Sequence, residues 1–350
     1  MQQGATLLWA LRSPCNLGCL YCYFGTIEDT GRRETTPGAL SHIGRDDISL
    51  HDALFFISTM TPECVRRVFV AGGEPLVWRG TMSVLAALKA QGCEVIVCTN
   101  GLPLQKQELC RSLLDLSIDA VSISLDSYDA QYNDHWRRDK SGQGWKGVVQ
   151  GIETLIQQRN ERSASTKIGV YSVITRRNLA QMVATGRFVA DLGVDYFIVQ
   201  PIALASDHPL FGELSLEACH REAFQAQIHA LHQAHLGIHL AHPSYIQQVL
   251  TTLSPGPLPV IKSCFGGRDL FFIEPNGSVW DCPSMDKIQQ TPSTHYRTMK
   301  GASAEALFSR ERRGRNTDCT LFSQDCVNMW QLMQFDAILT QERRTHEQLL

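Results

Sequence analysis

Three cysteines lie close together near the start of the chain, in the stretch Ser-Pro-Cys-Asn-Leu-Gly-Cys-Leu-Tyr-Cys. The thiols of Cys15, Cys19 and Cys22 can meet at one point only if the backbone forms a compact loop. Soft thiolates suit iron–sulfur clusters, whose irons are usually held by four cysteines. Three cysteines therefore leave one iron of a four-iron cluster without a protein ligand, and a substrate can bind there.

These thiols have two alternative roles, a structural zinc site and a disulfide framework. A structural zinc site normally closes with four ligands from well-separated pairs, and no nearby histidine or cysteine completes this group. A disulfide framework is typical of short secreted chains, and three closely spaced thiols cannot all pair with one another.

The pattern Cys-x3-Cys-x2-Cys, with Tyr21 directly before the third cysteine, resembles the radical S-adenosylmethionine (SAM) enzymes. The resemblance implies that the three thiolates hold a [4Fe–4S] cluster and that the amino and carboxylate groups of SAM chelate its open iron. It also implies the reaction: the reduced cluster cleaves SAM to a 5′-deoxyadenosyl radical, which abstracts a hydrogen atom from an unactivated carbon.

A second motif, Gly72-Gly73-Glu74-Pro75, follows the predicted strand 66–71. Glycines let a backbone pass close to a ligand, and a glutamate can pair with an ammonium group. Alone, the tetrapeptide is an ordinary turn. Downstream of the cysteines it resembles the family motif that holds the methionyl amine of SAM.

Polar residues also end the next two predicted strands, namely Asn100, Ser124 and Asp126. In the family, positions like Ser124 and Asp126 face the ribose and methionyl groups of SAM, although such residues also serve as helix caps. Arg137, in a predicted polar loop at 134–138, resembles the family arginine that contacts the SAM carboxylate; Arg138 is equally placed.

The elements that carry these motifs alternate between strand and helix. Six strand–helix repeats with short connections predict a parallel sheet curled into a partial barrel, an α/β fold that matches the family's (β/α)6 core. The predicted strands are 6–12, 66–71, 93–101, 120–126, 167–175 and 195–200. The predicted helices are 52–60, 81–91, 104–115, 148–159 and 179–192.

A second set of cysteines lies near the end of the chain. Cys264 and Cys282 flank two apolar stretches, 270–273 and 278–280, joined by Glu-Pro-Asn-Gly, which predicts a β-hairpin that brings both thiols to one metal. Cys319 and Cys326 could supply two more ligands. The spacing Cys-x12-Gly-x4-Cys resembles the auxiliary-cluster domains of SPASM and twitch radical SAM enzymes. Too few cysteines follow for a full SPASM domain, so the resemblance implies one additional [4Fe–4S] cluster; structural zinc is the alternative.

We expect three parts: a radical SAM partial barrel at 1–205, a helical segment and linker at 206–260, and a small β-hairpin and helical cluster-binding domain at 261–350. Barely one strand precedes Cys15, so we expect no recognition domain before the barrel. A formal net charge of −3 argues against a dedicated nucleic-acid binder. The absence of a leader or of a long apolar run argues against a membrane protein and for a cytoplasmic one.

The leading functional hypothesis is a radical SAM oxidoreductase that tailors a ribosomally made peptide by cross-linking, dehydrogenation or epimerisation. The alternative is a dehydrogenase or epimerase of an aminocyclitol, sugar or nucleoside. A non-catalytic metal-binding scaffold is a third possibility, which predicts a broken SAM site. The expected partners are a flavodoxin- or ferredoxin-type electron donor and a separate peptide-recognition protein. Cys98 and Cys219 are candidate hydrogen-atom donors.

Overall fold

The computed structural model describes residues 4–22, 46–204, 206–284, 287–288, 290–311, 313, 318–320 and 324–340. The chain divides into two compact units, which are described separately. Unit 1 comprises Met1–Thr99, Arg111–Asp119 and Pro259–Phe322. Unit 2 comprises Asn100–Cys110, Ala120–Leu258 and Ser323–Leu350.

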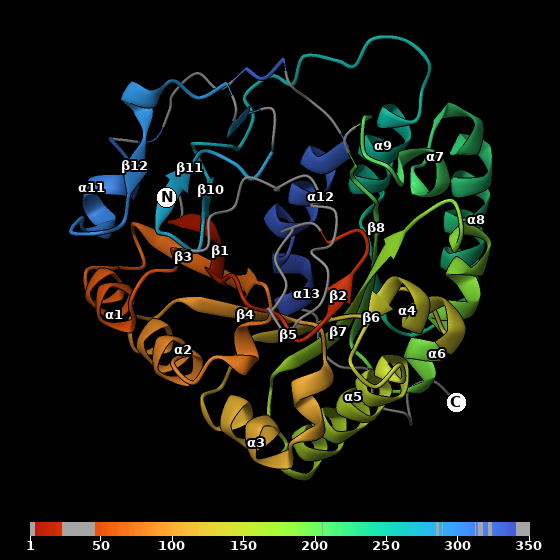
Figure 1. The fold of residues 1–350 in the computed structure, drawn as a ribbon, viewed down its shortest axis with the longest axis horizontal. Helices are drawn as coiled ribbons and strands as arrows, with labels where there is room; N and C mark the ends of the chain where they lie inside the picture. The colour runs from red at the N-terminus through yellow and green to blue at the C-terminus, as the bar shows by residue number, and fades with distance from the viewer. Residues whose placement is uncertain are drawn as a thin grey trace. The chain divides into compact units, whose positions relative to one another are not determined.

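Unit 1 contains a mixed sheet in the order β12-β11-β10-β1-β3-β4 (Figure 1). Its central strand β1 pairs in parallel with β3 on one side and with β10 on the other, and β4 continues the parallel part. β11 and β12 are antiparallel additions to β10. The strands are β1 (Ala5–Arg12), β2 (Gly18–Cys19), β3 (Val65–Gly72), β4 (Glu94–Thr99), β10 (Leu270–Ile273), β11 (Ser278–Trp280) and β12 (Arg297–Thr298). The helices are α1 (Leu50–Ser58), η1 (Pro75–Val77), α2 (Thr81–Ala90), η5 (Ser293–His295) and α11 (Ala304–Phe308).

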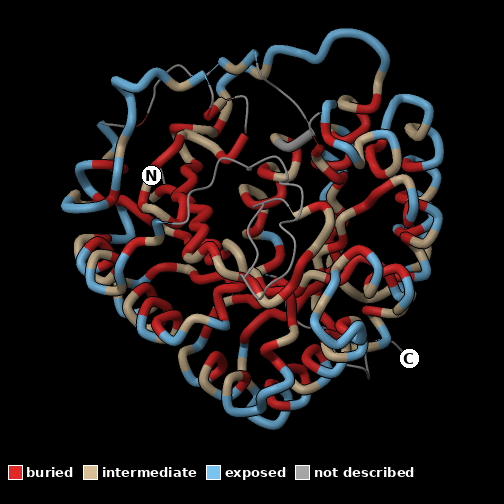
Figure 2. The backbone as a smooth tube through the Cα atoms, viewed as in Figure 1, coloured by how far each residue is buried: buried red, intermediate tan, exposed pale blue. Residues whose placement is uncertain are grey.

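Strand β1 lies in the core of unit 1 and is apolar along nearly its whole length. Both faces of this strand are buried, as expected for a parallel strand covered on both sides (Figure 2). Trp9 of β1 makes an edge-on contact with Phe56 of α1, and Phe56 contacts Phe308 of α11 in the same way. Phe308 also packs on Phe271 of β10, with ring centroids 4.8 Å apart. These aromatic contacts join the first strand to the C-terminal hairpin.

Unit 2 contains four parallel strands in the order β5-β7-β8-β9. Tyr196 of β8 contacts Phe335 and Tyr171 edge-on within its core. The strands are β5 (Ala120–Ser124), β6 (Arg137–Arg138), β7 (Lys167–Ile174), β8 (Tyr196–Pro201) and β9 (His239–Leu240). The helices are η2 (Leu102–Gln105), α4 (Ala130–Trp136), α5 (Gly144–Glu161), η3 (Leu179–Gln181), α6 (Met182–Asp191), α7 (Phe211–Leu214), η4 (Ala218–His220), α8 (Arg221–Gln233), α9 (Pro243–Thr252), α12 (Gln324–Met333) and α13 (Asp336–Thr340); α3 (Gln107–Asp115) has residues in both units.

The N-terminal ends of two strands, β4 and β7, are each fixed by a half-buried aspartate that also pairs with a cation. In unit 1, the Asp119 carboxylate accepts the N–H of Val95 at 2.7 Å and forms an ion pair with Lys89. In unit 2, the Asp195 carboxylate accepts the N–H of Ile168 at 2.7 Å and pairs with a guanidinium, that of Arg159. A helix supplies the cation in each unit, α2 in the first and α5 in the second.

The predicted α/β class with parallel strands is confirmed, and each of the six predicted strands is present. The polar loop predicted at 134–138 is wrong. That stretch ends helix α4 and forms the short strand β6. Asp129 caps the helix by accepting the N–H of Gln131, and the helix buries the side chains of Tyr132 and Trp136.

Two further sequence predictions, a polar loop at 25–48 and a solvated basic run at 310–315, lie partly outside the described residues. Only 46–48 of the first stretch and 310, 311 and 313 of the second are described. Within the described part of the chain, no helix is both long enough and apolar enough to cross a membrane.

Candidate functional site

Cys15, Cys19 and Cys22 lie in the loop that follows β1. Cys15 is buried, and the other two cysteines are half-buried. Burial raises the pKa of the Cys15 thiol well above its usual value, and the nearby groups of Cys19, Glu74 and Cys22 raise it further. The groups of Cys19, Cys22 and Glu74 therefore lie close enough to Cys15 to oppose its ionisation. A bound cluster with a positively charged core would relieve that opposition.

The chemistry of this donor set fits an iron–sulfur cluster. Among the described residues, no group of three or more His, Cys, Asp or Glu side chains could hold a single metal ion. In a [4Fe–4S] cluster each thiolate binds a different iron, so its ligands stand further apart than those of one tetrahedral ion. Three grouped thiols in a partly buried loop meet the cluster's requirement.

Backbone hydrogen bonds join the Gly72-Gly73-Glu74 segment to the start of this loop. The N–H of Gly73 donates to the Arg12 carbonyl at 2.8 Å, and the N–H of Glu74 donates to the Pro14 carbonyl at 2.9 Å. A Cβ atom on Gly73 would lie 2.2 Å from the Pro14 oxygen. Only glycine permits this approach, which brings the segment that follows β3 against the segment that follows β1.

The Glu74 carboxylate is fully buried at the C-terminal ends of β3 and β4. Its Oε1 atom accepts the hydroxyl of Thr99 at 2.8 Å and the N–H of Leu76 at 3.0 Å. A buried, oriented carboxylate is suited to pairing with an ammonium group. The sequence pointed to Glu74 but not to Thr99 as its partner.

Cys98 of β4 is near the same carboxylate. Burial, followed by the charge of Glu74, raises the pKa of the Cys98 thiol to about 12. Its side chain is half-buried. At neutral pH this residue is a protonated thiol, which is the form that can give up a hydrogen atom.

In unit 2, Asp126 follows β5 and is buried. One carboxylate oxygen accepts the N–H of Val173 at 2.8 Å, and the other lies 3.2 Å from an Arg137 nitrogen. Asp126 and Arg137, which the sequence predicts separately as SAM-binding residues, are therefore in direct contact. Ser124, at the end of β5, is half-buried.

Asn178 is a residue of this network that sequence reasoning missed. Its amide nitrogen donates to the Asp126 carbonyl at 2.8 Å, and its amide oxygen accepts the N–H of Thr175 at 2.7 Å. Tyr132 also reaches Thr175, with 2.9 Å between the two hydroxyl oxygens. An asparagine just after a predicted strand was the available signal.

The other predicted cofactor residues are also largely enclosed. Tyr21 is buried in unit 1. Asn100 is buried in unit 2, and its side-chain oxygen accepts the N–H of Leu102 at 3.0 Å, which starts the turn into η2. Asn100 therefore shapes the backbone at the end of β4.

The C-terminal thiols of unit 1 line one cavity of about 730 Å³. Cys264 and Cys282 lie at the two ends of the β10–β11 hairpin, as predicted from their spacing. Cys319 joins them because it exchanges backbone hydrogen bonds of 2.8 and 2.9 Å with Ile261. Contact with Cys319, followed by burial and by the group of Cys282, raises the pKa of the Cys264 thiol. Cys326 is half-buried and belongs to unit 2.

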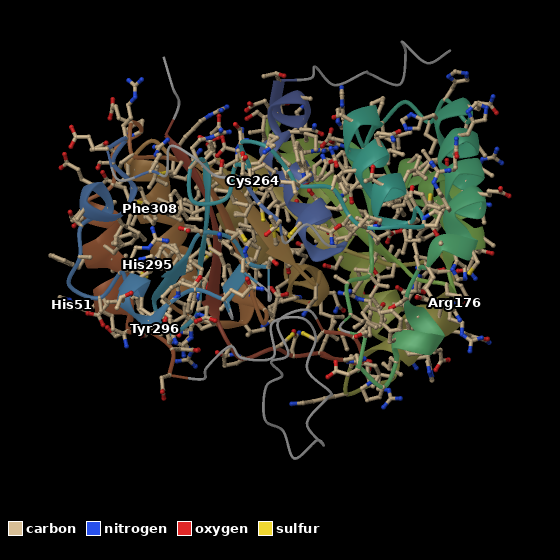
Figure 3. The ribbon with its side chains drawn as sticks, turned by 90° about the horizontal axis from the view of Figure 1, so that it is seen from above. His51, Arg176, Cys264, His295, Tyr296 and Phe308 are labelled. Carbon is tan, nitrogen blue, oxygen red and sulfur yellow. The ribbon has the colours of Figure 1, made fainter. Side chains whose placement is uncertain are left out.

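Aromatic and charged groups complete the wall of this cavity (Figure 3 labels Cys264, His295 and Tyr296). Trp280 and Tyr296 make an edge-on contact with centroids 5.2 Å apart. Tyr296 is 61% exposed, whereas Trp280 is buried. The Arg297 guanidinium forms an ion pair with Asp281. The cavity thus offers thiols inside and an aromatic side chain at the surface.

Among the described residues, the remaining cysteines form no metal-binding group of three or more. Cys64, Cys93 and Cys110 are buried. Cys219 is exposed on the short helix η4, and its sulfur lies 3.3 Å from Nδ1 of the adjacent His220.

Residues 14–185 match the sequence model of the Radical SAM superfamily. Two curated relatives cover 79% of this chain. The AdoMet-dependent heme synthase of Methanosarcina barkeri is 22% identical and is covered over 76% of its length. The mycofactocin maturase of Mycobacterium ulcerans is 27% identical and is covered over 68% of its length.

Among solved structures, SuiB of Streptococcus suis bound to S-adenosylmethionine is similar to this chain with a TM-score of 0.62. The similarity covers 89% of this chain and 67% of SuiB, at 16% sequence identity. At that identity the likeness concerns the fold, and it confirms the partial-barrel architecture.

Proposed function

We propose that this chain, whose residues 14–185 are a radical SAM domain, reductively cleaves SAM and abstracts a hydrogen atom from an unactivated C–H bond of a peptide. The observation that carries the proposal is the grouping of Cys15, Cys19 and Cys22 beside buried Glu74. A scaffold without catalysis would need the thiols but would not need a buried carboxylate oriented beside them.

Cys15, Cys19 and Cys22 would hold the cluster, and Gly72, Gly73 and Glu74 would hold the methionyl end of SAM. When bound, the reduced cluster supplies the electron that breaks the C5′–S bond of SAM. Glu74 would receive the ammonium, because its orientation is already fixed by Thr99. In unit 2, Ser124, Asp126 and Arg137 would contact the ribose and carboxylate groups, with Asn100 and Tyr21 shaping the site.

A peptide substrate is supported by the named functions of the relatives. One is a mycofactocin maturase, and SuiB has also been solved bound to its precursor peptide SuiA. The proposed outcomes for the peptide are a cross-link, a dehydrogenation or an epimerisation. A separate protein would present the peptide, and a flavodoxin- or ferredoxin-type protein would deliver electrons.

A second [4Fe–4S] cluster is proposed at the cavity of unit 1, where Cys264, Cys282 and Cys319 would be its ligands. The fourth ligand that the sequence predicts, Cys326, belongs to unit 2. The support is the cavity that three of these thiols line. A cluster with four thiolate ligands has no open iron, so it suits electron transfer better than substrate chelation. This role favours oxidative outcomes on the peptide.

A small-molecule substrate is the second candidate, because one relative is named a heme synthase. Under that reading the chain would be a dehydrogenase or epimerase of an aminocyclitol, sugar or nucleoside. Cys98 and Cys219 remain proposed hydrogen-atom donors for an epimerisation under either reading.

Anaerobic reconstitution with iron and sulfide, followed by reduction in the presence of SAM, tests the proposal. We expect 5′-deoxyadenosine to form slowly even without substrate. A precursor peptide encoded by a neighbouring gene should then lose hydrogen or gain a cross-link by mass spectrometry, or exchange a Cα hydrogen for deuterium in heavy water. No 5′-deoxyadenosine from a protein that has assembled its cluster would overturn the enzyme reading, and turnover of a small molecule alone would replace the peptide.

A further inference from the structure

Residues 12–14 form the root of the Cys15 loop, and one side of this root is held by the glycine segment. The Arg12 and Pro14 carbonyls accept backbone N–H groups from Gly73 and Glu74. On the side that faces the glycine segment, the carbonyl groups of the loop root are therefore hydrogen-bonded to main-chain N–H groups. The N–H and hydroxyl of Ser13 need another partner.

That partner is Asp47, thirty-four residues further along the chain. Its two carboxylate oxygens accept the Ser13 N–H at 3.0 Å and the Ser13 hydroxyl at 2.5 Å. The same carboxylate forms an ion pair of 3.0 Å with Arg12, and only 6% of its side chain is exposed. Asp47 thus binds two consecutive residues that precede Cys15.

Arg12 is itself fixed on two further sides. Its guanidinium carbon lies 4.8 Å from the ring centre of Trp78, and it donates to the Ile48 carbonyl at 3.2 Å. The Ile48 N–H donates in turn to the carbonyl of Pro275 in the hairpin turn, at 2.7 Å. Asp47 is therefore part of a rigid connection and not a mobile surface group.

Helix capping does not account for Asp47. Helix α1 is capped by Ser49, whose hydroxyl accepts the N–H of Asp52 at 3.1 Å. The neighbouring Asp46 is exposed and has no hydrogen bond or ion pair with the described part of the chain. A nearly buried carboxylate that serves no helix and binds the root of the cysteine loop requires a role at that loop.

We propose that Asp47 is a positioning residue for the cluster at Cys15, Cys19 and Cys22: it fixes the loop root through Ser13 and offsets the charge of Arg12, which precedes Cys15 in the same loop root. This inference rests on the proposed function. Because each electron added to a cluster is a negative charge, an adjacent anion disfavours reduction and an adjacent cation favours it. Asp47 and Arg12 therefore act on the cluster's reduction potential in opposite directions.

The experiment compares the full chain with Asp47→Asn, Arg12→Gln and the matched control Asp46→Asn. Each protein is reconstituted, poised at fixed potentials, and read by electron paramagnetic resonance at the signal that changes when SAM is added. We expect Asp47→Asn to raise the ratio of reduced to oxidised cluster by at least about twofold. We expect Arg12→Gln to lower it and Asp46→Asn to leave it unchanged.

Two controls distinguish an effect on the cluster from a loss of folding. They are the iron content of the reconstituted proteins and the thermal unfolding midpoint of the metal-free proteins. The ratio is measured only on assembled clusters, so partial loss of folding does not alter it. Equal potentials in all four proteins would overturn the role of Asp47, even if Asp47→Asn is unstable. Failure of the unmodified chain to assemble a SAM-responsive cluster would instead defeat the proposed function.

Discussion

The two thiol groups of unit 1 are built in different ways. Cys15, Cys19 and Cys22 come from one short loop, whose root is held by Gly73, Glu74 and Asp47. The other group joins a hairpin to a segment far along the sequence. Cys264 and Cys282 flank the hairpin, and Cys319 reaches them through its bonds to Ile261.

The surroundings of the two groups differ as well. The first group has a buried carboxylate, Glu74, beside it, which suits the recognition of a charged ligand. The second has a cavity with an exposed aromatic side chain, Tyr296, and an ion pair at its wall. Under the proposed function, the first site would bind a reactant, whereas the second site would exchange electrons.

The largest expected effect is that of Cys15→Ala. Loss of one of three thiolates should abolish assembly of the first cluster, so 5′-deoxyadenosine should fall below detection. Iron should fall from about eight to about four per chain, because the second group keeps its ligands. The exposed Cys219 provides the control, since Cys219→Ala should retain all iron. Undiminished SAM cleavage in Cys15→Ala would break the comparison.

The double variant Cys264→Ala and Cys282→Ala should give the complementary result. It should also lose about half of the iron, but SAM cleavage should persist while modification of the substrate stops. Metal analysis by mass spectrometry and quantification of 5′-deoxyadenosine check both parts. Four irons and one zinc in the unmodified chain would instead assign the second group to structural zinc.

Gly73→Ala should weaken the first site only. The new Cβ would lie 2.2 Å from the Pro14 oxygen, so the root of the loop must shift. We expect destabilisation by about 1–3 kcal/mol and a higher KM for SAM, with the second site still loaded. Gly212→Ala is the matched control, because nothing lies within 4 Å of a Cβ at that position. Denaturant unfolding and SAM titration measure the effects, and equal behaviour of both variants would contradict the close approach.

The smallest effect is expected for Cys98→Ala. Cys98 lies on β4, outside the Cys15 loop, so we do not expect it to bind iron although it is near Glu74. Iron content and uncoupled SAM cleavage should match the unmodified chain. Loss of iron in this variant would make Cys98 a fourth ligand and remove the open iron on which the comparison depends.

The local sequence was sufficient to predict an element when the residues that define its pattern are contiguous in the chain. The apolar stretch at 6–12 became β1, and the hairpin at 270–280 was predicted with its correct strands. The helix α4 was missed because its seven residues carry too few apolar positions to show a helical period. Short helices of this kind depend on tertiary burial of residues such as Tyr132 and Trp136.

The partners that fix the candidate site could not be predicted in the same way. Asp47 meets Ser13 across thirty-four residues, and Asn178 meets Asp126 across fifty-two. Nothing near Asp47 in the sequence distinguishes it from Asp46. The parallel pairing of β10 with β1 is also invisible locally, because parallel partners can come from any part of the chain.

The aspartates at the strand starts have a consequence for how the sequence can change over time. Asp119 and Asp195 each bind the amide of the second residue of a strand, in β4 and β7 respectively, and a cation from a helix. These bonds hold the strand register at one end of the strands. A substitution in the loops at the opposite end therefore does not shift the register, which would turn the side chains to the wrong face of the sheet. The loop ends can therefore accumulate changes that suit a new substrate while the strands beneath keep their alignment.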